Sequence, residues 1–202
     1  MDIVVESVKK LETMLENSGC CDGGVRLDVD PDIINCRFER GACMVADFGN
    51  KRGVFTTFDP IRACTKISFM FGAPLDSMDV RSAAGAILNV ASGFFCLTRT
   101  LRPCDRSSHP ACTSALAEAL AKQPVYIFGT LPVTEALTRI AIVDDPANAG
   151  IILIAGEGLI TPGAGDLIAR YRQDKRIICL GPSAGGIARL NELEHWCPYG
   201  RS

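Results

Sequence analysis

Long apolar runs dominate the second half of the chain, and three of them end at a glycine. The runs span residues 125–128, 151–155 and 177–180, and they are followed by Gly129, Gly156 and Gly181. Apolar runs without polar alternation are typical of strands that are buried on both faces, as in a parallel sheet. Helical periodicity between and after these runs predicts helices from about Pro132, over 163–173 and over 185–193. Strands that alternate with helices indicate βαβ units, so we expect a Rossmann-like parallel sheet in the C-terminal half.

The first half of the chain has a different pattern, in which short β-rich segments lie among helices. Three segments with strand character occupy residues 25–29, 41–48 and 53–58, and 50–53 is the expected tip of a hairpin. Apolar periodicity and an Asp-Pro start predict helices at residues 2–17, 59–71, 77–97 and 111–122. The chain is therefore expected to be an α/β protein with an α+β subdomain over 1–122 and a Rossmann-like subdomain over 123–202.

The composition of the chain indicates which classes of partner and which cellular compartment are expected. The 202 residues include 22% charged side chains with a net charge of −2, so no nucleic-acid partner is expected. The apolar stretches are too short to span a membrane, and the start of the chain lacks the basic residues of a signal peptide. We therefore expect a cytoplasmic protein whose ten cysteines are reduced thiols, with Cys96 and Cys179 in the core.

The three glycine turns are the first candidate site. Because the carboxyl ends of parallel strands meet at one edge of a sheet, all three turns are expected there, where ligands of α/β proteins bind. Backbone N–H groups at such turns attract phosphate or carboxylate groups, although glycines also serve simply to make tight turns. The candidate ligand-binding residues are Gly129, Thr130, Gly156, Glu157, Gly181, Pro182 and Ser183.

A nucleotide is one alternative ligand for this edge. Gly129 is not followed by the second and third glycines of the dinucleotide fingerprint. Asp144 follows a short predicted strand over 141–143 and is a candidate for contact with a ribose hydroxyl. The chain has no nucleophile elbow, P-loop or HExxH motif, which argues against nucleophilic hydrolysis and phosphoryl transfer.

Cysteines close to the two histidines suggest a second kind of site. Cys and His are the side chains that transition metals such as zinc prefer, and the candidate ligands are Cys104, His109, Cys112, His195 and Cys197. No CxxC pair supports a closed structural site, and polar loops with free thiols are the alternative interpretation. Arg99, Arg102 and Arg106 form a local basic patch that either holds an anion or is simply a solvated face.

Several short motifs resemble a family of uncharacterised prokaryotic proteins described as heavy-metal-chelation domains. The matching stretches are Gly53 to Phe58, Phe71 to Leu75, Ala86 to Asn89, Val125 to Pro132 and Arg176 to Ser183. The family usually has Thr-Pro or a similar pair after its last Gly-Pro loop, and this chain has Ala184-Gly185 instead. The resemblance implies an enolase-N-terminal-like first half, a Rossmann-like second half and a site between them. In that site the glycine loops would face the Asp59-Pro60 segment and the helix start at Asp79.

Three functional hypotheses follow. The leading one is a small-ligand-binding protein of metal or metallocofactor handling that binds a small-molecule or metal ligand at the glycine-rich strand ends, with or without catalysis. The second is an enzyme that uses a nucleotide or S-adenosylmethionine. The third is a non-catalytic assembly subunit that forms a homo-oligomer.

Overall fold

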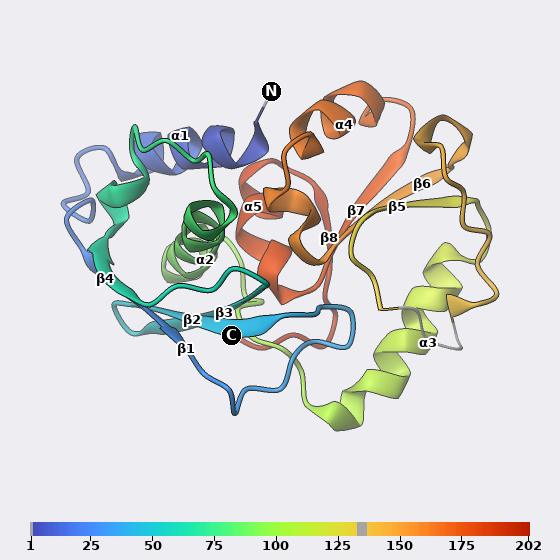
Figure 1. Ribbon diagram of the computed structural model, residues 1–202, viewed down its shortest axis with the longest axis horizontal. Coiled ribbons are helices and arrows are strands. Elements are labelled where there is room, and N and C mark those ends of the chain that lie inside the picture. Colours follow the sequence, from blue (N-terminus) through green and yellow to red (C-terminus); the bar gives the residue numbers. More distant parts are fainter. Residues whose placement is uncertain (1, 133–136) are drawn as a thin grey trace.

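Two four-stranded sheets form the framework of the protein (Figure 1). The computed structural model describes residues 2–132 and 137–202. The N-terminal sheet is antiparallel with the order β3-β2-β1-β4, and the C-terminal sheet has the order β5-β6-β7-β8 with every neighbouring pair parallel. The expected α/β fold, with a parallel sheet in the C-terminal half, is confirmed.

The antiparallel sheet departs from the sequence prediction in two places. Its strands are β1 (Gly24–Val29), β2 (Ala42–Phe48), β3 (Lys51–Thr57) and β4 (Ala63–Lys66). The pairing of Phe48 with Lys51 places the hairpin turn at residues 49–50, so the predicted tip at 50–53 was wrong. The predicted helix over 59–71 was also wrong, because Ala63–Lys66 pairs with β1 as an edge strand before a 3-10 helix at Ile67–Met70.

The parallel sheet is buried on both faces, as its apolar runs predict. Its strands are β5 (Val125–Gly129), β6 (Ile151–Ala155), β7 (Arg176–Leu180) and β8 (Glu194–Trp196), the last of which the sequence analysis did not predict. Alternate residues of β6 face opposite sides, because Leu153 packs with the α3 side chains Leu116 and Leu120, whereas Ile152 and Ile154 belong to the central core.

The α-helices fill the space between the sheets and cover the parallel sheet. They are α1 (Ile3–Leu15), α2 (Met78–Phe94), α3 (His109–Leu120), α4 (Ala164–Tyr171) and α5 (Gly185–Leu190). Helix α2 lies between the antiparallel sheet and α5 (Figure 1). Its small residues allow this close packing, because a Cβ at Gly85 would lie 2.7 Å from the Phe55 ring. Five of the predicted helices are therefore observed, as α1 to α5, and the one predicted near Pro132 falls partly outside the described residues.

One buried side chain connects the two halves directly. The Asn89 amide on α2 donates to the Val54 carbonyl on β3 and to the Pro182 carbonyl, and it accepts from the Gly186 N–H over 2.9 Å. The main hydrophobic core likewise contains residues from both halves, from Ile3 to Ala188. Of the two cysteines expected in the core, Cys179 is fully buried. The expectation for Cys96 was wrong, because it lies exposed beyond the end of α2 with φ at 59°.

Candidate functional site

The three glycine turns lie along one edge of the parallel sheet, at the carboxyl ends of β5, β6 and β7. The first two turns pack directly against each other. A Cβ at Gly129 would overlap the Ala155 carbonyl oxygen, and one at Gly156 would lie 2.8 Å from the Thr130 carbonyl oxygen. Backbone atoms therefore fill the space beside these two glycines.

The turn after β6 is attached to the N-terminal half through Glu157. Its Oε1 accepts hydrogen bonds from the Thr57 hydroxyl and, over 3.0 Å, from the Phe58 N–H. The Thr57 hydroxyl also accepts from the Asp59 N–H over 3.0 Å. The Asp59 segment therefore adjoins this glycine loop, as the family resemblance implies, and the Glu157 carboxylate is already engaged within the protein.

The turn after β7 holds a carboxylate that belongs to the protein itself. Ser183 donates from its N–H to Glu39 Oε1 over 3.1 Å and from its hydroxyl to Glu39 Oε2 over 3.0 Å. The Ser183 Oγ in turn accepts from the Thr56 N–H over 2.8 Å. Gly181 has φ at 93°, and a Cβ there would overlap Glu39 Oε1. The predicted Gly181–Ser183 loop thus binds an acidic group, and that group is Glu39.

Glu39 is an ionisable group in an unusual environment. It is only 3% exposed. Burial raises the pKa of its carboxyl group to about 7, although the hydrogen bonds from Ser183 act in the opposite direction. At neutral pH both the charged and the neutral forms are therefore populated.

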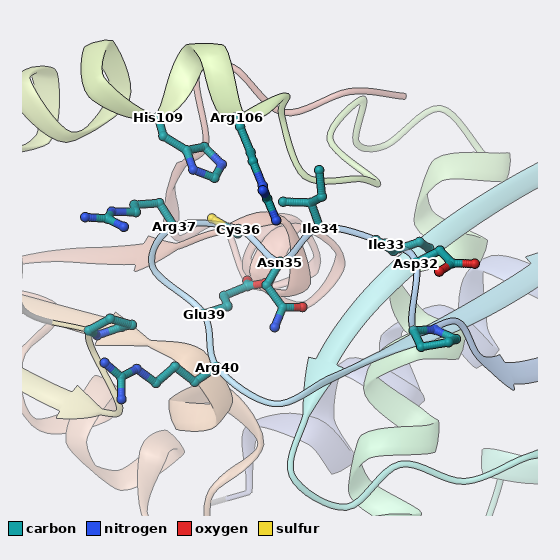
Figure 2. A pocket seen from close by; sticks show the side chains of 12 residues that line it. Asp32, Ile33, Ile34, Asn35, Cys36, Arg37, Glu39, Arg40, Arg106 and His109 are labelled. Carbon is teal, nitrogen blue, oxygen red and sulfur yellow. The ribbon is translucent and has the colours of Figure 1, made fainter.

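A pocket of about 640 Å³ opens beside Glu39, between the loop that joins β1 to β2 and the start of α3 (Figure 2). The loop after β5 contributes Pro132 to it. Its volume is in the range of small-molecule sites. The polar lining residues are Asp32, Asn35, Arg37, Glu39, Arg40, Arg106 and His109, and the apolar ones are Pro31, Ile33, Ile34, Cys36 and Pro132.

The arginines that line this pocket have no acidic partner in the part of the chain that the structure describes. Among the described residues, the guanidinium groups of Arg37, Arg40 and Arg106 form no ion pair or hydrogen bond. Elsewhere in the described residues, Arg26, Arg52, Arg62, Arg81, Arg176 and Arg201 each pair with a carboxylate, whereas the guanidinium groups of Arg99, Arg139, Arg172 and Arg189 form no ion pair or hydrogen bond. An arrangement of three unpaired arginines around one pocket favours a negatively charged ligand.

His109 adds a further polar group to the same wall. Its Nε2 atom is buried and has no hydrogen-bond partner among the described residues. Burial lowers the pKa of His109, and the neighbouring charges of Arg37 and Arg106 lower it further. A buried nitrogen without a partner is unfavourable.

The predicted metal ligands do not assemble into a metal site. Cys104, Cys112 and Cys197 are close enough to influence one another electrostatically, but among the described residues no three Cys, His, Asp or Glu side chains could hold a metal ion. Burial raises the pKa of the Cys112 thiol to about 11 and also raises the pKa values of the other two thiols. His195 Nε2 lies 2.7 Å from the Gly181 carbonyl oxygen. These residues therefore do not fit a metal centre.

Asp144 also lies apart from the glycine edge. The preceding residue, Val143, donates to the Val125 carbonyl, and Ile142 forms a parallel bridge with Val125 at the start of β5. Asp144 is exposed and lies level with the first half of β5, whereas Gly129 ends that strand. The structure does not bring Asp144 and Gly129 together as a ribose and phosphate site would require.

The sequence analysis did not identify most of the pocket. Arg106 was named only as part of a basic patch, and Arg37, Glu39 and Arg40 were not singled out. The one signal for them is the charged run Arg37-Phe-Glu-Arg40 before Gly41, in which Phe38 is fully buried. A buried phenylalanine within a charged run indicates a loop that is fixed against the fold.

Comparisons with known proteins leave the function open. No family model matches the chain, and no curated protein matches it. Among solved structures, the chain is similar to a protein of unknown function from the DUF364 family of Pyrococcus horikoshii, with 14% sequence identity and a TM-score of 0.45. The match covers 90% of this chain and 79% of that chain. The description of that protein names no metal and no ligand. No helix among the described residues of the present chain is long and apolar enough to cross a membrane.

Proposed function

We propose that this protein binds a small organic anion, such as a carboxylate or a phosphate ester, in the pocket between the β1–β2 loop and α3. The observation that carries the proposal is the convergence of Arg37, Arg40 and Arg106, without acidic partners among the described residues, on one pocket of about 640 Å³. Guanidinium groups suit such ligands because each can donate two parallel hydrogen bonds to a carboxylate or phosphate.

The pocket also has an apolar side that an uncharged part of the ligand could cover. Ile33 and Ile34 line one side of it, and Ile34 is 40% exposed. Covering this apolar surface with the body of the ligand contributes hydrophobic stabilisation that an inorganic ion cannot provide. An organic anion therefore fits the lining better than a bare inorganic one.

The other functional hypotheses receive less support. A nucleotide or S-adenosylmethionine at the glycine edge would need the Ser183 donors, which Glu39 already occupies, and the space beside Gly129 and Gly156, which backbone atoms fill. Metal or metallocofactor handling rests on the family resemblance, since the candidate ligands do not converge. The assembly-subunit hypothesis stays a prediction, and an oligomer of this chain in solution would support it.

The proposal is tested by titrating the purified protein with sulfate, succinate and glycerol 3-phosphate in a calorimeter. We expect succinate and glycerol 3-phosphate to bind more tightly than sulfate, and we expect Arg106→Gln to weaken binding by about tenfold. The matched control is Arg172→Gln, which removes the same charge from an exposed position at the end of α4. Equal affinities in the two variants, or no binding of any of the three anions, would overturn the proposal.

A further inference from the structure

A buried carboxyl group, that of Glu39, lines a pocket to which three arginines and one further carboxylate, Asp32, also contribute. Glu39 enters the pocket from the same loop as Arg37 and Arg40, and Arg106 and His109 face this loop from the start of α3 (Figure 2). Both Glu39 oxygens already accept hydrogen bonds from Ser183. No guanidinium group among the described residues is paired with it. Its negative charge therefore remains uncompensated by any cation in contact with it.

We propose that Glu39 must hold a proton for the anion to bind, an inference that rests on the proposed function. The pocket then takes up one proton with each anion. A charged Glu39 would face the negative ligand across a space from which the ligand excludes water. Like charges repel strongly under those conditions because the local dielectric constant is low. Glu39 would thus determine both the affinity of the pocket and its dependence on pH.

The environment of Glu39 places this proton exchange near neutral pH. Burial raises its pKa to about 7. A bound anion would raise this pKa further, because a nearby negative charge favours the neutral carboxyl group. Proton uptake on binding is the thermodynamic counterpart of that increase.

The other ionisable groups around Glu39 do not change charge in the same range. Burial raises the pKa values of the neighbouring thiols above that range, so they stay neutral, and the arginines stay charged. Burial lowers the pKa values of the two nearby histidines below their usual 6.5. The ionisable groups around Glu39 are Cys36, Arg37 and Arg40 on the same loop, Cys43 on β2, His195 on β8, Cys197 after β8, Arg106 just before α3 and His109 at its start. Asp32 lines the pocket as well.

The test compares the wild type with Glu39→Gln, which replaces the carboxyl group with a neutral group of the same shape. Binding of sulfate and succinate is measured by calorimetry at pH 6.5 and pH 8.5, in two buffers that differ in ionisation enthalpy. For the wild type, we expect the dissociation constant to rise about 25-fold over this range for a group with a pKa near 7, with close to one proton taken up at pH 8.5. For Glu39→Gln, we expect tight binding at both pH values and no proton uptake. The control Glu16→Gln, at an exposed position, should behave as the wild type.

A second measurement uses the wild type alone, in case the variant fails to fold. Carbon-13 NMR of labelled glutamate follows the titration of Glu39 with and without succinate, and we expect its pKa to rise when succinate is bound. Binding with an unchanged Glu39 pKa, or the same pH dependence in Glu39→Gln as in the wild type, would overturn this inference and leave the proposed function standing. If sulfate, succinate and glycerol 3-phosphate all fail to bind at any pH, the proposed function fails and this inference fails with it.

Discussion

At the level of single residues, Glu39 is a buried carboxyl group whose ionisation is coupled to folding. Its carboxyl group is buried between Ser183 and the pocket, where neither water nor a positive charge stabilises the ionised form. Folding therefore increases its affinity for a proton. A group with this property makes the free energy of unfolding depend on pH even when no ligand is present.

The first prediction concerns that dependence. The carboxyl pKa rises from an ordinary value of 4.5 to about 7 on folding, so between these values the folded state binds more protons than the unfolded state. The free energy of unfolding should consequently fall as the pH rises from about 4.5 to about 7, by an amount on the order of a few kcal/mol. Urea denaturation of the wild type and Glu39→Gln across this range measures the effect.

As the pH rises, the wild type should lose stability through Glu39 and the Glu39→Gln variant should not, so the variant gains stability relative to the wild type. Glu16→Gln provides the comparison for an exposed carboxyl group. Parallel pH profiles for the wild type and Glu39→Gln would show that the Glu39 carboxyl group titrates alike in the folded and unfolded states.

At the level of elements, the turn after β7 is shaped to admit the Glu39 carboxylate. Gly181 has a left-handed backbone conformation and lacks the Cβ that would overlap the carboxylate. Gly163, before α4, has nearly the same φ of 92°, but no heavy atom lies within 4 Å of the position its Cβ would occupy. Their ψ angles differ, 166° at Gly181 and −15° at Gly163, so Gly181 combines the rarer backbone conformation with the steric conflict.

We predict that Gly163→Ala loses about 1–2 kcal/mol of stability through backbone strain alone. Gly181→Ala should lose about 1–3 kcal/mol more, because its backbone conformation suits only glycine and the new methyl group displaces Glu39 from its hydrogen bonds to Ser183. Guanidinium denaturation of both variants at one pH provides the measurement. Equal losses would mean that Glu39 moves aside without cost.

The elements also show what the sequence could and could not predict. The three apolar runs were recognised as buried parallel strands because no polar residue interrupts them, and that property is local. The segment 63–66 was misjudged because Asp59-Pro60 resembles a helix start, whereas pairing with β1 determines the outcome. The contact of Glu39 with Ser183 spans 144 residues, and no local pattern specifies it.

For the whole molecule, the connections between the sheets favour unfolding as one unit. The main core draws on both halves, and Asn89 bonds to backbone groups of β3, of the turn after β7 and of α5. Neither half retains its buried surface without the other. The boundary predicted near residue 122 marks a change in the pattern of apolar residues, and one hydrophobic core contains residues from both sides of it.

We therefore predict a single unfolding transition, with the same midpoint by far-ultraviolet circular dichroism and by the fluorescence of Trp196, which lies in the C-terminal half. Asn89→Ala should lower the free energy of unfolding by about 2–4 kcal/mol, because three buried backbone groups lose their partner. Asn148→Ala, at an exposed position, should have little effect. Separate midpoints for the two probes would contradict this prediction.

The hydrogen bonds between Glu39 and Ser183 have a consequence for protein engineering. The acceptor, Glu39, lies in the N-terminal half of the chain, and its donors, on Ser183, lie in the C-terminal half. A chimera that exchanges either half with that of a related protein therefore inherits only one of the two residues. Recombination within such a family would preserve the pocket only where both parents have compatible residues at these two positions.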